Sequence, residues 1–187
     1  MLKDNLLPPA KQKWAHSTCS QELLHAALTD STITAIEVDI LMGYEIQKDE
    51  TYPLLESNLS TEKVGRIPIM AHPPELESDL TMQDFLMKAS NPKDSNKKIL
   101  KHIKLDFKEM DAVEPTIAAI DKQGIRFDTN ASIYLNADVL PGPAMRKELP
   151  KMKGDDFLSI CLASCQKVLG RIFMLIVQYC IVYLFAF

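Results

Sequence analysis

Short apolar runs rich in β-branched residues alternate along this chain with amphipathic stretches, and that order constrains the fold more than any single motif. Five runs have the pattern of β-strands, at residues 14–16, 33–41, 67–72, 99–108 and 132–139. Four stretches have the pattern of helices, at residues 20–29, 81–89, 111–123 and 155–167. A parallel neighbour can be reached only through a crossover, so strands separated by helices predict βαβ units and an α/β fold with a parallel sheet. The polar stretches 43–66 and 90–98 are expected to be surface loops.

The composition is that of one soluble domain. The 187 residues match the length of a single domain, and an apolar share of 47% is enough to bury a core. The formal net charge of -4 leaves no basic surface of the kind that a phosphate backbone requires, so we expect no nucleic-acid partner. The 4 cysteines form no Cys-x-x-Cys pair, which indicates reduced, mostly buried thiols rather than a zinc module or a disulfide framework.

The two ends of the chain differ from its middle. Residues 1–14 contain no uninterrupted apolar segment of the secretory type, so a cytoplasmic protein is expected, with a secreted form only if the start is misassigned. Residues 172–187 carry no charge, but a membrane helix needs about 20 apolar residues, and this run is slightly shorter. It is compatible with a membrane anchor, a buried core element or an aberrant end. The expected division is an N-terminal extension (1–13), a domain (14–168) and a hydrophobic tail (169–187).

Polar or ionisable side chains close each of the five apolar runs. Where several end one run, they are spaced two residues apart and so share one face of a strand. The residues concerned are His16, Glu37, Asp39, His72, Lys104, Asp106, Lys108, Asn136 and Asp138. In a parallel α/β barrel the carboxyl ends of the strands hold the active site, and its groups come from several strands. These residues are therefore predicted to form one site.

Metal-assisted chemistry is the reaction type that this set favours. The carboxylates of Glu37, Asp39 and Asp106 would repel one another at one point unless a cation lay between them, and an all-oxygen set suits Mg²⁺ or Ca²⁺. A pair of histidines can exchange protons near neutral pH, and Lys104 or Lys108 would attract an anion, most naturally a phosphate ester. Taken singly, each of these residues is more often structural than functional, so the prediction rests on the whole set. A structural role is what we expect for the two remaining histidines, His25 and His102.

Five segments resemble the menorin family: WAH at 14–16, IEVD at 36–39, PIMAHPPE at 68–75, IKLDFK at 103–108 and LNADVLPGP at 135–143. That family is itself similar to the phospholipase C-like phosphodiesterases, which include the glycerophosphodiester phosphodiesterases and the spider-venom phospholipase D enzymes. Those enzymes are TIM-type barrels. The resemblance covers about residues 14–168, and the third and fifth segments are its most specific parts.

The resemblance implies a metal-assisted attack on a phosphodiester of the glycerophosphodiester or lysolipid type. By position, the catalytic pair would be His16 and His72, and the ligands of Mg²⁺ or Ca²⁺ would be Glu37, Asp39 and Asp106. The resemblance also places Lys108 at the phosphate, and from the strand-end pattern we add Lys104, Asn136 and Asp138 as further substrate-binding residues. The expected ligand is a phosphodiester small molecule or a lipid head group, with a protein partner and a membrane contact through residues 172–187 as further expectations. The alternatives are a non-catalytic menorin-like binding protein and an inactive truncated form.

The chain departs from the family pattern in two places. Relatives usually have a glycine and an asparagine shortly after the first histidine, whereas Ser17, Thr18 and Cys19 follow His16 here. A closed eight-stranded barrel needs at least about 200 residues. We therefore expect an incomplete TIM-type barrel of five to six βα units with an apolar tail. Such an open sheet would expose an unpaired edge and an apolar interior, which favours aggregation or dependence on a partner.

Overall fold

The structure is a computed structural model that describes residues 11–46, 65–90, 98–124, 126–127, 131–139, 152–169, 174–177 and 180–181. Within these residues the helices are α1 (Gln21–Thr29), α2 (Met82–Ala89), α3 (Val113–Lys122) and α4 (Gly154–Leu169), with a 3₁₀ turn at Met110–Ala112. The strands are β1 (Trp14–Ala15), β2 (Ala35–Glu45), β3 (Ile67–Met70), β4 (Glu77–Ser78), β5 (Lys98–Ile99), β6 (His102–Phe107), β7 (Arg126–Phe127), β8 (Ile133–Ala137), β9 (Met174–Val177) and β10 (Cys180–Ile181). The predicted α/β class is confirmed.

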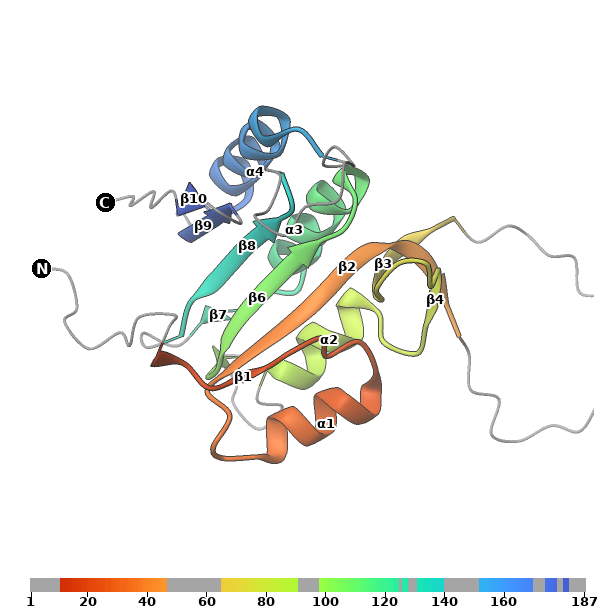
Figure 1. Cartoon of the computed structure of the whole chain (residues 1–187), viewed down its shortest axis with the longest axis vertical. Helices are drawn as coiled ribbons and strands as arrows, with labels where there is room; N and C mark the ends of the chain where they lie inside the picture. The colour runs from red at the N-terminus through yellow and green to blue at the C-terminus, as the bar shows by residue number, and fades with distance from the viewer. Residues whose placement is uncertain are drawn as a thin grey trace, which may run out of the picture.

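The central sheet is mostly parallel, and its strands follow the order of the chain. β1, β2, β6, β8 and β9 lie side by side with parallel pairing between neighbours (Figure 1). A helix connects most of these neighbours, as the βαβ pattern requires. Among the described residues no pairing joins β1 to β10, so the sheet is an open path and the closed arrangement of a TIM-type barrel is not observed.

The helix starts follow from local capping chemistry. Ser20 precedes α1, and its side chain accepts a hydrogen bond from the Leu23 amide at 3.2 Å. Thr81 precedes α2 and accepts from the Asp84 amide at 3.1 Å. These bonds satisfy amides that have no partner inside the helix. Both helices thus begin where the sequence pattern predicts.

The prediction of a parallel strand at residues 67–72 is wrong in direction. β3 runs antiparallel to the second half of β2, with Ile40 opposite Met70 and Gly43 opposite Ile67. β2 is 11 residues long, longer than β6, so its far half extends past the parallel partner and is available to a returning strand. Residues 43–45 accordingly belong to β2 rather than to a surface loop, and residues 47–64 lie outside the described residues.

The prediction of one strand over residues 99–108 is also corrected. β5 and β6 are separate, and β5 pairs with β7 in a small second sheet. Between them, the Lys101 ammonium donates hydrogen bonds to the carbonyls of Ala27 (2.7 Å) and Asp30 (2.8 Å) at the end of α1. Carbonyls in the last turn of a helix lack partners within the helix, so the Lys101 ammonium caps the C-terminus of α1. The residue lies between β5 and β6, where the predicted single strand is interrupted.

The two faces of the central sheet differ in chemistry because side chains alternate along each strand. One face packs against all four described helices in a single core cluster. Its strand residues stand in register, as Ile36, Val38 and Ile40 on β2, Ile103, Leu105 and Phe107 on β6, and Ile133, Leu135 and Ala137 on β8. The opposite face, which we call the polar face, consists of Ala35, Glu37, Asp39 and Leu41 on β2, His102, Lys104 and Asp106 on β6, and Tyr134 and Asn136 on β8.

Three aromatic side chains lie at the amino end of the polar face. The Trp14 and Tyr134 rings lie 5.9 Å apart between centroids, and the His102 and Tyr134 rings 6.1 Å apart. The Ser132 amide donates to His102 Nδ1 at 3.2 Å, so this nitrogen must carry a lone pair. The expectation that His102 is structural therefore agrees with its contacts, and His25 lies exposed on α1.

Part of the apolar C-terminal run takes the form of β-structure. β9 extends the central sheet by parallel pairing with β8, and β10 turns back antiparallel to β9. In the part of the chain that the structure describes, no helix has both the length and the apolar character needed to cross a bilayer.

Gly43 is predicted to be required where β3 and β4 both approach β2. A Cβ atom there would overlap Ile69 Cδ1 and would lie 2.5 Å from the Leu76 carbonyl oxygen. Gly43→Ala should lower the free energy of unfolding by about 2 kcal/mol, because backbone as well as side chain must shift. Gly65→Ala is the matched control, since nothing lies within 4 Å of its added methyl. Equal urea midpoints for the two variants would contradict a steric requirement for glycine at position 43.

His102 is predicted to make stability pH-dependent. Burial lowers its pKa below the ordinary 6.5, so the folded state favours the neutral ring. The unfolded chain then binds more protons, and the stability contributed by the neutral ring is complete above pH 6.5 and lost as the pH falls toward the lowered folded pKa. Urea unfolding between pH 5 and 7.5 should show this loss, and His102→Gln should reduce it. A pH slope unchanged in the variant would assign the effect to other groups.

Candidate functional site

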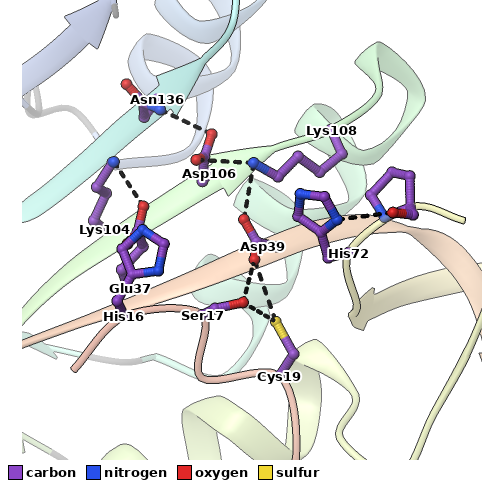
Figure 2. Close-up of polar contacts among 11 residues, drawn as sticks. His16, Ser17, Cys19, Glu37, Asp39, His72, Lys104, Asp106, Lys108 and Asn136 are labelled. Atoms are coloured by element: carbon purple, nitrogen blue, oxygen red, sulfur yellow. Dashed lines mark hydrogen bonds and ion pairs between the residues drawn. The ribbon is translucent and has the colours of Figure 1, made fainter. Parts of the chain in front are cut away.

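Three strands bring the predicted carboxylates and lysines together on the polar face. The register sets Glu37 beside Lys104, and Asp39 beside Asp106, which in turn lies beside Asn136. Figure 2 shows these side chains gathered over the middle of the sheet. Glu37, Asp39 and Asp106 are each at most 5% exposed. Buried carboxylates need hydrogen-bonding or charged partners, and every one of the three has them.

The Lys108 ammonium lies between two aspartates. Its Nζ is 2.8 Å from Asp39 Oδ1 and 3.0 Å from Asp106 Oδ2. The Lys108 amide donates to the Ile40 carbonyl at 2.8 Å, which anchors the residue just past the end of β6. Asn136 Nδ2 donates to the other oxygen of Asp106, Oδ1, at 2.8 Å. One cation is therefore shared by two carboxylates from neighbouring strands.

Lys108 and Asp39 each stabilise the charged form of the other. Burial alone would lower the pKa of Lys108, but the charges and hydrogen bonds of Asp106 and Asp39 outweigh it and raise the pKa to about 12. Burial likewise opposes ionisation of Asp39, yet the hydrogen bond and charge of Lys108, with help from Ser17, keep its pKa below the ordinary value. Asp39 and Lys108 are therefore charged at neutral pH.

Glu37 is held by two different groups. Its Oε1 accepts from Lys104 Nζ at 2.7 Å, and its Oε2 lies 2.7 Å from His16 Nε2. The His16 side chain is 78% exposed, whereas that of Glu37 is 4% exposed. A buried carboxylate thus orients an imidazole that is open to solvent. The carboxylate can only accept, so Nε2 carries the proton and Nδ1 of the neutral ring can accept one.

The turn after β1 contributes two side chains that the sequence prediction missed. Ser17 Oγ donates to Asp39 Oδ2 at 2.9 Å, and Cys19 Sγ donates to the same oxygen at 3.5 Å. The Thr18 amide is bonded to the Glu37 carbonyl at 2.9 Å, which ties the turn to β2. Burial is the largest influence on the Cys19 thiol and raises its pKa, so the group remains a neutral donor.

Ser17 adopts a backbone conformation that usually belongs to glycine. Its φ of 51° is in the left-handed region, where a side chain is strained. The serine that follows His16, where the family resemblance led us to expect a nearby glycine, was the available signal that this turn is unusual. The structure supplies the compensation, since the strained residue makes a hydrogen bond to Asp39 that glycine could not make.

His72 and Asp138 lie at the margin of the cluster. The Ala71 amide is bonded to the Asp39 carbonyl at 3.1 Å, which brings His72 beside the site (Figure 2). His72 is exposed, and its Nδ1 is 2.8 Å from the Pro73 carbonyl, an acceptor, so Nδ1 carries the proton. Asp138 is exposed just beyond β8. Within the described residues, no hydrogen bond or ion pair links either side chain to the carboxylates.

The cations that meet the three carboxylates are the chain's own lysines. In the described part of the chain no three carboxylate, imidazole or thiol groups are arranged so that they could together hold a metal ion. Three converging carboxylates are expected to need a cation between them, and Lys104 and Lys108 supply that charge here. The donors are nevertheless all carboxylate oxygens, the type that Mg²⁺ and Ca²⁺ prefer.

Comparison with known proteins gives a family match over most of the chain. Residues 10–169 match the family described as the Menorin N-terminal domain. Protein FAM151B of Homo sapiens is 32% identical over 134 residues, which cover 72% of this chain and 39% of the relative. The chain thus spans well under half of the length of this curated relative. No solved structure matches the chain.

Removal of the shared lysine is predicted to destabilise the fold in a pH-dependent way. Lys108→Met leaves two buried carboxylates without their cation, which should lower the free energy of unfolding by about 3 kcal/mol at pH 7. The loss should shrink near pH 4, because protonated aspartates no longer need the ammonium. Lys122→Met, on the exposed end of α3, is the control and should change stability by about 0.5 kcal/mol or less. A loss of the same size at both pH values would argue against the ionic origin.

Proposed function

This chain belongs to the menorin family, and from that premise we propose that its polar face is a metal-assisted phosphodiester site of the phosphodiesterase type. The observation that carries the proposal is the shared cation position between Asp39 and Asp106, which Lys108 fills from 2.8 and 3.0 Å. A cluster of alternating acidic and basic groups beside an exposed imidazole has the components needed to bind a phosphoryl group and move a proton.

The charge balance of the cluster favours a divalent cation. Glu37, Asp39 and Asp106 contribute three negative charges, and Lys104 and Lys108 two positive ones, so the cluster has a formal charge of about −1 with His16 neutral. A phosphodiester anion would be repelled by that sum. Addition of one Mg²⁺ or Ca²⁺ reverses the sign, which is the physical reason to expect cation and substrate to bind together.

The carboxylates of Glu37, Asp39 and Asp106 are the proposed ligands, which would have to close around the ion, because in the described residues they are not arranged to hold one together. Their oxygens are the hard donors that these ions prefer, and two of them already share one cation position. A bound cation would supply positive charge to the phosphoryl oxygens. Asn136 holds Asp106 by its 2.8 Å hydrogen bond, and Ser17 holds Asp39 by its 2.9 Å bond, so both aspartates are oriented before any ligand arrives.

The histidines divide the proton chemistry. His16 points Nε2–H at Glu37 and leaves Nδ1 of the exposed ring to accept a proton. His72 points Nδ1–H at the Pro73 carbonyl and leaves Nε2 to do the same. We assign His16 to one side of the phosphodiester and His72 to the other. His16 would accept a proton at Nδ1 as the base, and His72 would act as the acid in the form that also carries a proton on Nε2. Lys108 would hold the phosphoryl charge, and exposed Asp138 lies at the rim of the site.

A phosphodiesterase assay tests the proposal directly. The purified chain should hydrolyse bis(p-nitrophenyl) phosphate or glycerophosphocholine only when Mg²⁺ or Ca²⁺ is present. Glu37→Gln should reduce kcat/KM by about 100-fold or more, because it removes both a proposed ligand and the orienting partner of His16. Glu114→Gln, an exposed change on α3, is the control and should leave turnover unchanged. Turnover that survives chelation, or an unaffected Glu37→Gln, would refute the proposal.

A further inference from the structure

Lys108 lies at the point where the chain leaves the central sheet. The parallel pairing of β2 with β6 ends at Ile40 and Phe107, and the Lys108 amide then donates to the Ile40 carbonyl at 2.8 Å. The 3₁₀ turn begins at Met110. Glu109 is thus the one residue between Lys108 and that turn, so a movement of Glu109 is passed directly to the Lys108 backbone.

The Glu109 side chain takes over the pairing where β6 ends. Its Oε1 accepts a hydrogen bond from the Met42 amide, two residues beyond Ile40 on β2. The donors on one edge of a strand recur every second residue, so in a longer parallel ladder this amide would bond a backbone carbonyl of the neighbouring strand. The Glu109 carboxylate supplies the acceptor that the departing chain no longer offers.

Arg66 supports the same carboxylate from the residue before β3. Its guanidinium donates to the Met42 carbonyl at 3.4 Å and lies 3.8 Å from Glu109 Oε1. The side chains of Arg66 and Glu109 are 43% and 34% exposed, so their ion pair contributes little. The hydrogen bond from the Met42 amide is therefore the contact that holds Glu109, and the reach of the side chain matters more than its charge.

Resting on the proposed function above, we infer that Glu109 is a positioning residue of this site and acts through Lys108. Its bond to the Met42 amide fixes the start of the loop after β6, which keeps the Lys108 ammonium 2.8 Å from Asp39 and 3.0 Å from Asp106. Among the described residues, no hydrogen bond or ion pair joins Glu109 to the carboxylates of the site. In the reaction, Glu109 holds the ammonium where the phosphoryl charge would lie.

Two variants separate the reach of Glu109 from its charge. Glu109→Asp keeps the charge but is one methylene too short for the Met42 amide, whereas Glu109→Gln keeps the length and an acceptor oxygen but loses the charge. The readout is the exchange of the Lys108 ammonium protons with water, measured by nuclear magnetic resonance and assigned by the signal that Lys108→Met lacks. Hydrogen-bonded protons exchange slowly, so Glu109→Asp should speed this exchange about tenfold, and Glu109→Gln should keep it within about twofold.

Two controls show whether the effect is specific. The Lys104 ammonium, bound to Glu37 on the same face, should exchange at an unchanged rate in both variants. Thr81→Ala removes the N-terminal cap of α2 and lowers stability without touching the loop after β6, so it should leave Lys108 exchange unchanged. No acceleration in Glu109→Asp, or an equal acceleration in Thr81→Ala, would overturn the inference. Glu109→Ala, which removes the acceptor altogether, gives the same test if the aspartate variant fails to fold.

An activity assay separates the inference from the proposed function. With Mg²⁺ and bis(p-nitrophenyl) phosphate, Glu109→Asp should lower kcat/KM about tenfold, and Glu109→Gln should restore most of it. If the original chain shows no turnover but Lys108 exchange follows the expected pattern, the proposed function is overturned and the positioning of Lys108 by Glu109 stands. If the original chain is active and Glu109→Asp leaves kcat/KM unchanged, the inference alone is overturned.

Discussion

The Lys108 ammonium between Asp39 and Asp106 is the interaction on which the polar face depends. Two carboxylates on neighbouring strands, both nearly inaccessible to water, could not remain ionised side by side without it. The raised pKa of Lys108 and the lowered pKa of Asp39 are two expressions of the same stabilisation. Because the pair joins β2 to β6, it also stabilises the central pairing of the sheet. The groups that stabilise the sheet are thus the same ones that we propose as the functional site.

The two-faced sheet explains how a small domain can bury so many charges. The apolar face is covered by helices and contributes the hydrophobic core, so stability does not require the polar face to be apolar. On the polar face, the aromatic contacts of Trp14, Tyr134 and His102 lie at the amino end of the strands. The charged side chains lie further toward the carboxyl end, where Lys104 pairs with Glu37, and Lys108 pairs with Asp39 and Asp106.

The turn from His16 to Cys19 shows how a departure from a family pattern can be accommodated. Ser17 accepts left-handed strain and Cys19 remains a neutral donor, and both direct hydrogen bonds at Asp39 Oδ2. These bonds leave Asp39 Oδ1 to face Lys108. The orientation of the aspartate is thus determined from three sides, by the turn, by β2 and by the lysine after β6. A site with its ligands oriented in advance loses less entropy when it binds.

The sequence by itself determined which residues lie on one face, because the period of two along a strand is a local property. Glu37 with Asp39, and Lys104 with Asp106 and Lys108, could be grouped in this way, and the helices could be placed from their caps and periodicity. The direction of each strand, the closure of the sheet and the pairing between distant strands could not be predicted from the sequence. Only the tertiary structure decided that β3 returns antiparallel, that His72 and Asp138 stay at the margin, and that Ser17 meets Asp39 across 22 positions. It alone decided that lysines fill the cation positions at the carboxylates, with Lys104 meeting Glu37 across 67 positions. The reason is physical, since register between distant strands and the reach of long side chains follow from packing of the whole domain, which no local pattern encodes.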